Sequence, residues 1–374
     1  MILGVSAEQE ELRASVRRFL ADRAPMSRVR ALMDGGETDW AVWEQAGSQL
    51  GLQGLAIPES YGGAGFSFAE QAVVLEEFGA ALYGGPYLAS AVLAATALLA
   101  SPDEGARRGL LPDIASGQTV ATLAFTEDGG SWDPAAIRLS AVKDGPGVDG
   151  AWRLDGHKSF VLDGATAGLI LVVATTDAGL SLFAVEGDAA GLGRAALPAL
   201  DQTRQLARLE FAGVTGRLIG SPGDGAAALD RALDVAAVAL AAEQLGGAQR
   251  ALDMAVEYAK VRRQFDRPIG SFQAIKHRCA DLLLEVESLR SAVGYAAAAV
   301  AEDSAEIPVL ASLVKAYASE TYFHVAAENI QIHGGIGFTW EHDAHLYFKR
   351  AKASELFLGD GAYHRERLAN RIGL

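Results

Sequence analysis

The sequence predicts an α+β protein in which helical parts at both ends flank a β-rich middle part. Half of its 374 residues are hydrophobic, alanine-rich runs recur and aromatic residues make up only 7%, which favours closely packed helices over an all-β protein. Between Pro112 and Thr119 this character changes to short alternating runs separated by glycine and aspartate, and it returns after Gly220. A chain of this length exceeds the size at which one core stops growing. We therefore expect a helical N-terminal domain over residues 1–118, a β domain over 119–220 and a four-helix bundle over 221–374.

The N-terminal part predicts three helices. Ser6 and Gln9 form a capping-box pattern ahead of apolar residues at helical spacing, and a second helix is expected over 40–50. Residues 55–70 read LAIPESYGGAGFSFAE, in which a proline and a glycine pair force an irregular turn. Serine and glutamate near the end of this segment are typical of a helix start, so a third helix is expected over 67–82.

The middle part predicts an antiparallel barrel or sandwich. Its apolar residues alternate with polar ones between turn signals, which is the pattern of half-buried strands. The expected strands cover residues 120–126, 136–144, 151–164, 169–176, 180–186 and 207–213.

The last part predicts a bundle of long antiparallel helices. Pro222 stands where a helix accepts a first-turn proline, and the helical pattern that follows continues to Arg263. Three further helical stretches are expected over 272–302, 306–333 and 341–372. Four such helices in sequence pack as a bundle.

Charge and cysteine content exclude several functions. The net charge of −15 opposes binding of a phosphate backbone, so no nucleic acid partner is expected. Cys279 is the only cysteine, which excludes a disulfide and a CxxC metal motif, and we interpret it as a small buried hydrophobe on a helix. Glutamates at positions 8, 10 and 11 replace the basic start of a signal peptide, and the longest apolar run, 91–100, is too short to span a membrane. We expect a cytoplasmic protein without a metal site.

Two blocks in the last third indicate a phosphate-bearing ligand. Arg262 and Arg263 close a helical pattern, where guanidinium groups suit a phosphate. A glycine cluster that begins at Gly334 interrupts another helical run after Gln331, so backbone can approach a bulky anion closely. Each signal alone is also typical of an ordinary helix end, and only their combination favours a dinucleotide with a pyrophosphate.

Both blocks resemble the acyl-CoA dehydrogenase family. They read EYAKVRRQFDRPIGSFQAIKHRCADL and ENIQIHGGIGFTWEHDAHLYFKRAK, and IPESYGGAGFS followed by LEEFG is similar to the family's N-terminal helical domain. The resemblance covers essentially the whole chain. It implies the family's architecture of a helical N-terminal domain, an antiparallel β-barrel or sandwich and a C-terminal four-helix bundle.

The resemblance also implies a reaction. Members of the family use FAD to remove a proton from Cα of an acyl-CoA thioester and a hydride from Cβ, which leaves a trans-2-enoyl-CoA. The electrons then pass to an electron-transferring flavoprotein. Because a proton next to a thioester is a weak acid, such enzymes hydrogen-bond the carbonyl and place a desolvated carboxylate as the base.

The family's flavin-binding positions fall partly on matching residues. AFTEDGGSWD resembles the segment in which a threonine and a serine bond the flavin, here Thr126 and Ser131, with one residue fewer between them. GHKSFVLDG resembles GxKxWITNG, whose tryptophan packs near the flavin ring and whose threonine bonds N5. Phe160 and Leu162 stand at those places, so no hydroxyl is available for N5.

The ADP half of FAD is assigned by the resemblance to the C-terminal blocks. Arg262, Phe265, Gln331 and Gly335 match residues that in the family hold this half of an FAD bound mainly by a neighbouring subunit. Asp266 departs from the family, because it replaces a glycine and places negative charge near the expected pyrophosphate.

The catalytic base is missing at both positions known in the family. Leu358 takes the place of a glutamate in the last helical stretch, and Ala236 takes the place of the glutamate that another branch carries on the first bundle helix. Glu243 and Asp360 lie near these places without matching them. We interpret Glu243 as a structural polar contact between bundle helices and Asp360 as an exposed helix cap.

Two hypotheses follow for the function. The chain is either a homotetrameric acyl-CoA dehydrogenase with a displaced base, or a partner subunit without its own base. The second resembles the α2β2 family members that act on steroid side-chain or other bulky acyl-CoA thioesters, in which one subunit type carries the carboxylate. The loss of both glutamates, together with Leu162, favours the partner hypothesis.

Overall fold

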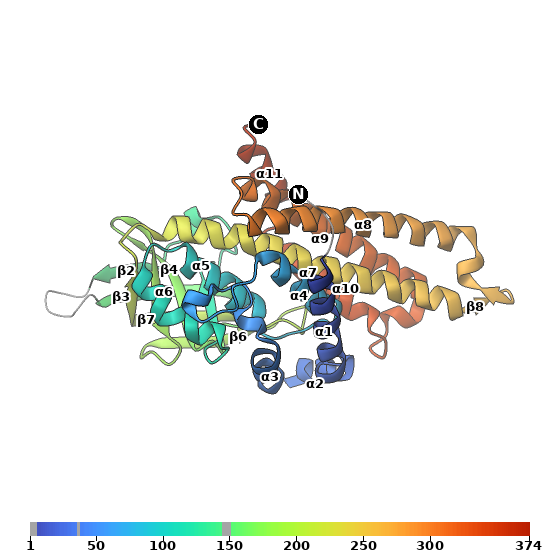
Figure 1. The fold of residues 1–374 in the computed structure, drawn as a ribbon, viewed down its shortest axis with the longest axis horizontal. Coiled ribbons are helices and arrows are strands. Elements are labelled where there is room, and N and C mark those ends of the chain that lie inside the picture. Colours follow the sequence, from blue (N-terminus) through green and yellow to red (C-terminus); the bar gives the residue numbers. More distant parts are fainter. Residues whose placement is uncertain (1–5, 36–37, 144–150) are drawn as a thin grey trace. The chain divides into compact units, whose positions relative to one another are not determined.

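The computed structural model describes residues 6–35, 38–143 and 151–374 (Figure 1). The chain divides into two compact units, which are described separately. The bundle unit comprises Met1–Ala31, Phe68–Tyr83 and Ala237–Leu374, and the barrel unit comprises Leu32–Ser67 and Gly84–Ala236. The predicted domain bounds at residues 118 and 220 stay a prediction. Over the described ranges, no helix is both long enough and apolar enough to cross a membrane.

The barrel unit is built on seven strands that enclose its core. β4 pairs in antiparallel fashion with β5, β5 with β7, β7 with β3 and β3 with β2, and β2 returns to β4, so the strands form a closed ring. Strands β1 and β2 lie parallel to β4, and β6 pairs with β7 outside the ring. The strand bounds are β1 Ala121–Ala124, β2 Ser140–Lys143, β3 Ala151–Leu162, β4 Leu169–Thr176, β5 Gly179–Glu186, β6 Leu192–Leu197 and β7 Leu206–Ile219.

The predicted barrel is confirmed, with three corrections. The two parallel pairings contradict a purely antiparallel arrangement, and β6 was not predicted because its alternating residues are mostly exposed. The second strand is shorter than expected, since a 3₁₀ turn occupies Pro134–Ala136, and its predicted last residue, Asp144, lies outside the described residues. Helices of this unit are α3 Trp40–Leu50, α5 Ala95–Ala100 and α6 Glu104–Ala115, with a π-helical segment at Leu88–Ala94.

A bulge in β3 shapes the edge of the barrel. The register with β7 shifts between Lys158 and Val161, which leaves Ser159 and Phe160 without partners in the ladder. Phe160 has a φ of 56°, in the left-handed region that an aromatic residue rarely adopts. The bulge therefore turns the phenyl ring out of the regular alternation of the strand.

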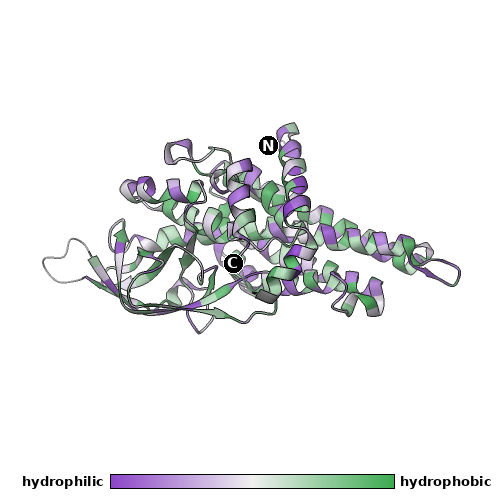
Figure 2. Cartoon of the chain, turned by 90° about the horizontal axis from the view of Figure 1, so that it is seen from below, coloured by the Kyte–Doolittle hydropathy of each residue, from purple (hydrophilic) through white to green (hydrophobic). Residues whose placement is uncertain are grey.

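The bundle unit consists of long helices that lie side by side (Figure 1). A two-stranded hairpin, β8 Arg263–Gln264 and β9 Arg267–Pro268, joins α7 to α8, and Figure 2 shows this tip as hydrophilic. The helices are α1 Ala7–Arg23, α4 Phe68–Ala80, α8 Gln273–Ala301, α9 Ile307–His333, α10 Ala344–Leu356 and α11 Gly361–Arg371. Both α2 Met26–Gly35 and α7 Gly225–Val261 cross the boundary between the units, and α7 belongs to the barrel unit up to Ala236.

Helices α4 and α7 cross in direct backbone contact. A Cβ atom added to Gly246 would lie 1.7 Å from the Glu76 carbonyl oxygen, and one added to Gly79 would lie 1.8 Å from that of Glu243. Any side chain at either position would overlap the opposite helix, so both positions require glycine.

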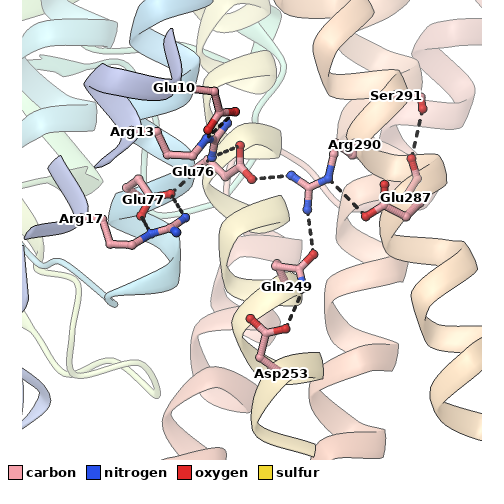
Figure 3. A network of polar contacts seen from close by, with 10 residues as sticks. All are labelled: Glu10, Arg13, Arg17, Glu76, Glu77, Gln249, Asp253, Glu287, Arg290 and Ser291. Atoms are coloured by element: carbon pink, nitrogen blue, oxygen red, sulfur yellow. Dashed lines mark hydrogen bonds and ion pairs between the residues drawn. The ribbon is translucent and has the colours of Figure 1, made fainter. Parts of the chain in front are cut away.

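An ion-pair network joins four helices of the bundle unit (Figure 3). Arg290 of α8 donates to Glu76 of α4 at 2.6 Å and to Gln249 of α7 at 2.7 Å. Arg13 of α1 reaches the other oxygen of Glu76 at 2.8 Å. Because these groups are half-buried and share a carboxylate, the network fixes α1 against the bundle.

The helical predictions match most helices to within a few residues, with two corrections. The capping box of Ser6 and Gln9 is present at α1, and α3 has the predicted bounds. Pro222 was placed wrongly, because it lies in a turn before α7 begins at Gly225. The expected last helix over 341–372 is two helices, α10 and α11, separated by a sharp turn at Leu358.

Candidate functional site

In the barrel unit, Thr126 presents a buried hydroxyl just after β1. The residue is 3% exposed, and its Oγ1 has no hydrogen-bond partner among the described residues. Ser131, a few residues later, is exposed and accepts a hydrogen bond from the Asp133 N–H at 3.2 Å. A buried hydroxyl without a partner is unfavourable unless a ligand satisfies it, so Thr126 is a candidate ligand contact.

The turn that carries Thr126 and Ser131 lies against the bulge of β3. The Ser159 N–H donates to the Thr126 carbonyl at 2.8 Å. A Cβ atom on Gly130 would lie 3.7 Å from the Phe160 ring. The structure thus brings Thr126, Ser131 and Phe160 together, although 29 positions separate Ser131 from Phe160 in the sequence.

Two carboxylates of this turn are ionised and paired. Burial opposes the charge of Glu127, but the N–H groups of Leu139 and Arg138 and the Lys158 ammonium outweigh it and lower the Glu127 pKa. Hydrogen bonds from Arg208 and Ser159 lower the pKa of Asp128 to about 2. Lys158 itself is completely buried, and this burial lowers its pKa to about 8.

Leu162 offers no polar contact from its side chain. The side chain is buried, the Leu162 carbonyl accepts from the Thr122 hydroxyl at 2.6 Å, and the residue pairs with Leu206 of β7. The backbone of this strand end is therefore satisfied inside the barrel.

In the bundle unit, Arg262 and Phe265 lie at the exposed hairpin after α7. The Arg262 N–H donates to the Tyr258 carbonyl, and the Arg262 carbonyl accepts from Ile269 N–H, each at 2.8 Å. Phe265 is 87% exposed and has a φ of 52°. Asp266 lies in the same turn, and its carbonyl accepts from Arg263. The hairpin thus holds its backbone in place while leaving the Arg262 and Phe265 side chains accessible.

Gln331 and Gly335 lie at the same end of the bundle. Gln331 is exposed on the last turn of α9, where Gly334 ends the helix with a φ of 65°. A Cβ atom on Gly334 or Gly335 would meet nothing within 4 Å, so the backbone there is open to a ligand. The ring of His333 stacks on Tyr258, one turn before Arg262, with centroids 4.3 Å apart. This stacking brings the two sequence blocks together.

The two positions at which the sequence predicted a missing base hold buried apolar side chains. Ala236 is fully buried on α7, and Leu358, 4% exposed, lies between α10 and α11 with a φ of 63°. Glu243 pairs with the buried Arg350 of α10 at 2.7 Å, which confirms its predicted structural contact. Asp360 caps α11 by accepting from Tyr363 N–H at 2.8 Å, as predicted, but it is half-buried rather than exposed.

The turn around Leu358 is held through its carbonyl groups. The completely buried Lys315 ammonium donates to the carbonyls of Glu355 at 3.1 Å and Gly359 at 2.9 Å. His364 Nε2 lies 3.0 Å from the Leu358 carbonyl. Burial, reinforced by Lys315, lowers the His364 pKa to about 3, so its imidazole is neutral and donates.

Sequence reasoning missed both buried lysines. Lys158 occupies the lysine position of the GxKxWITNG pattern, which was the available signal. Lys315 falls at the spacing of the apolar face of α9, together with Ala311, Ala318 and Tyr322. A lysine on an apolar face indicates a buried cation with polar partners.

Comparison with known proteins decides the family. Models of the acyl-CoA dehydrogenase N-terminal, middle and C-terminal domains match residues 6–118, 122–214 and 223–373. The acyl-CoA dehydrogenase IpdE2 of Mycobacterium tuberculosis is 37% identical over 353 residues, which cover 94% of this chain and 93% of that protein. The chain belongs to the acyl-CoA dehydrogenase family. Members of this family are FAD-dependent oxidoreductases that act on the CH–CH group of acyl-CoA.

Solved acyl-CoA dehydrogenases share the fold over nearly the whole chain. A variant of the Tcur3481–Tcur3483 steroid ACAD is 34% identical with a TM-score of 0.88, and the match covers 99% of this chain and 98% of that one. The ChsE4–ChsE5 complex from Mycobacterium tuberculosis is 30% identical with a TM-score of 0.89, covering 100% and 99%. The predicted acyl-CoA dehydrogenase-like fold is therefore confirmed.

The described residues fit FAD in both units. Thr126 supplies an unsatisfied buried hydroxyl beside an aromatic ring, as a flavin requires. Gly334 and Gly335 expose backbone, and Arg262 adds an accessible guanidinium, as a pyrophosphate requires.

Proposed function

We propose that this acyl-CoA dehydrogenase is a subunit of an α2β2 enzyme for steroid side-chain or other bulky acyl-CoA thioesters. In this assembly it binds FAD jointly with a second, base-bearing subunit, and the electrons leave to an electron-transferring flavoprotein. The observation that carries the proposal is Leu358. Its turn is held in place by Lys315 and His364, while its side chain is unable to accept a proton.

The two carboxylates considered as a displaced base, Glu243 and Asp360, have other partners, which supports the same proposal. The Glu243 carboxylate is committed to Arg350, and Asp360 is committed to the first turn of α11. Two of the similar proteins are described as a steroid ACAD and as the complex of two different chains, ChsE4 and ChsE5. The second candidate, a homotetramer with a displaced base, requires one of these carboxylates to leave its partner.

Each residue proposed for FAD has one task. Thr126 and Ser131 bond the flavin, Phe160 packs against its ring, and Arg262 with Gln331 and the Gly335 backbone holds the ADP half. FAD, when bound, supplies the hydride acceptor. Phe265 covers the ADP half from the hairpin.

The test of the proposed function is reconstitution. The purified chain alone is expected to carry less than one FAD and to show no dehydrogenation of acyl-CoA or steroid-CoA thioesters, because it lacks the carboxylate and Leu162 removes a flavin contact. Addition of a base-bearing homologue should restore turnover and full flavin absorbance. Turnover by a homotetramer of the chain alone, with one tightly bound FAD per chain, would overturn the partner role and favour Glu243 or Asp360 as the base.

Arg262→Ala is expected to weaken FAD binding more than folding. An exposed guanidinium at a helix end contributes little to stability without a ligand, whereas a charge-assisted contact to a pyrophosphate contributes about 1.5–3 kcal/mol. The rise in melting temperature on addition of FAD should therefore shrink in this variant. Arg263→Ala, which removes the neighbouring arginine that bonds the Asp266 carbonyl, is the matched control. An unchanged rise for Arg262→Ala would show that the phosphate site lies elsewhere.

A further inference from the structure

Lys158 makes an unusual set of contacts for a side chain that is completely buried. Its ammonium lies 3.0 Å from the Phe125 carbonyl and 2.9 Å from Glu127 Oε1. These partners are the residues immediately before and after Thr126. The same Glu127 oxygen also accepts the N–H groups of Arg138 and Leu139, each at 2.8 Å, so it is fixed by three donors.

The next residue of β3 completes the arrangement. Ser159 donates its N–H to the Thr126 carbonyl at 2.8 Å and its hydroxyl to Asp128. Lys158 and Ser159, two consecutive residues at the β3 bulge, therefore hold residues 125–128 of the turn. They bond its backbone carbonyl groups and its carboxylates. The Thr126 side chain is the member of this turn whose buried oxygen bonds nothing among the described residues.

We propose that Lys158 is the positioning residue that fixes the Thr126 hydroxyl for the flavin. This proposal rests on the proposed function, in which Thr126 bonds FAD. Without Lys158, the turn would keep the Ser159 contact to Thr126. It would lose the ammonium group that bonds Phe125 and Glu127 on either side of Thr126. The hydroxyl would then occupy several orientations. The cost of ordering it would make the free energy of FAD binding less favourable.

The charge on Lys158 gives the proposal a pH signature. The charged group placed against Lys158 is Glu127, and the residue opposite it on β7 is the apolar Leu209. With a pKa of about 8, lowered from an ordinary value of 10.5, Lys158 loses its proton as the pH rises through 8, and its anchor on Glu127 weakens. Folding stability changes in the opposite sense. The unfolded chain binds the extra proton between these two pKa values, so this group makes the folded state more stable as the pH rises. The titration of Lys158 therefore does not itself unfold the chain over this range.

The experiment is a double-mutant cycle measured by FAD titration, which gives an affinity even when the isolated chain carries less than one FAD. Thr126→Val is expected to lower the affinity about three- to tenfold, the effect of one hydrogen bond. Lys158→Met should lower it by a similar factor, and the double variant by no more than the larger single loss. Arg208→Ala is the matched control, because it removes a half-buried cation that bonds Asp128 of the same turn, and its affinity should match that of the wild type.

Wild-type protein titrated at pH 7 and at pH 9 provides a second measurement that needs no Lys158 variant. The affinity should fall at the higher pH in the wild type but not in Thr126→Val. Three results would each overturn the positioning role while leaving FAD binding intact. The first is that the losses of affinity multiply in the double variant, and the second is that Lys158→Met binds FAD with the affinity of the wild type. The third is an equal pH dependence of the affinity in the wild type and in Thr126→Val. Absence of FAD binding by the wild type in every condition would instead overturn the proposed function, and the positioning role with it.

Discussion

An Arg350→Ala substitution is expected to lower the free energy of unfolding by about 3–5 kcal/mol, because it leaves the Glu243 carboxylate buried without its guanidinium partner. Arg350 is 2% exposed and Glu243 is 7% exposed, and their atoms lie 2.7 Å apart between α10 and α7. Urea denaturation followed by far-ultraviolet circular dichroism measures the change.

Arg365→Ala provides the control for this prediction. Arg365 and Glu320 form an ion pair between α11 and α9 whose side chains are 57% and 58% exposed. Solvent screens such a pair, so its loss should cost no more than about 1 kcal/mol. The double variant Arg350→Ala, Glu243→Ala should recover part of the larger loss, because it also removes the buried charge that has lost its guanidinium partner. Equal effects of Arg350→Ala and Arg365→Ala would show that the buried pair has no special role.

Leu358→Glu is expected to give little or no dehydrogenation in the isolated chain. General-base catalysis contributes about 10²–10⁴-fold, but only where flavin and thioester are correctly placed. Under the proposed function, Leu162 and the shortened turn between Thr126 and Ser131 are expected to leave this chain's flavin contacts incomplete. In the reconstituted complex, removal of the carboxylate from the base-bearing subunit should therefore lower turnover by about 10²–10⁴-fold. Leu358→Glu in this chain should not restore the turnover.

Leu358→Gln serves as the control, since glutamine has the shape of glutamate without a basic carboxylate. An electron-acceptor-coupled assay over a panel of acyl-CoA and steroid-CoA thioesters, with each variant alone and in the complex, gives the comparison. Burial at this position would raise the pKa of the new carboxyl, so any activity gained should increase with pH. Robust turnover by Leu358→Glu, absent from Leu358→Gln, would mean that the chain lacks only the carboxylate.

Local signals in the sequence predicted local structure well. The capping box at Ser6 and the bounds of α3 depend on contacts within a few residues, so spacing and residue type were sufficient. The strands β3, β4 and β5 likewise lie between the predicted turn residues, although β4 and β5 are buried along most of their length instead of alternating. The matched FAD residues fall into two groups, one in each unit, as the family pattern implies, and their roles stay predictions.

Features that depend on distant residues were not predictable in the same way. The break between α10 and α11 requires left-handed backbone at Leu358, a residue with no preference for it, and is held by Lys315 from another helix. The parallel pairing of β1 with β4 joins segments that are far apart in the chain. The sequence predicted a structural contact for Glu243 but not its partner, because no sequence pattern connects Glu243 to Arg350.

The way in which the turn at Leu358 is held bears on how a subunit without a base at this position keeps its fold. Lys315 and His364 bond carbonyl groups there, and these carbonyl groups are the same whatever side chain position 358 carries. The backbone conformation does impose one restriction, since a β-branched residue is strongly disfavoured at a φ of 63°. Leucine and glutamate are both unbranched at Cβ, so one can replace the other without a compensating change in the turn. Under the proposed function, the absence of a base at this position therefore leaves the fold of the subunit intact, and the subunit depends on its partner for the carboxylate.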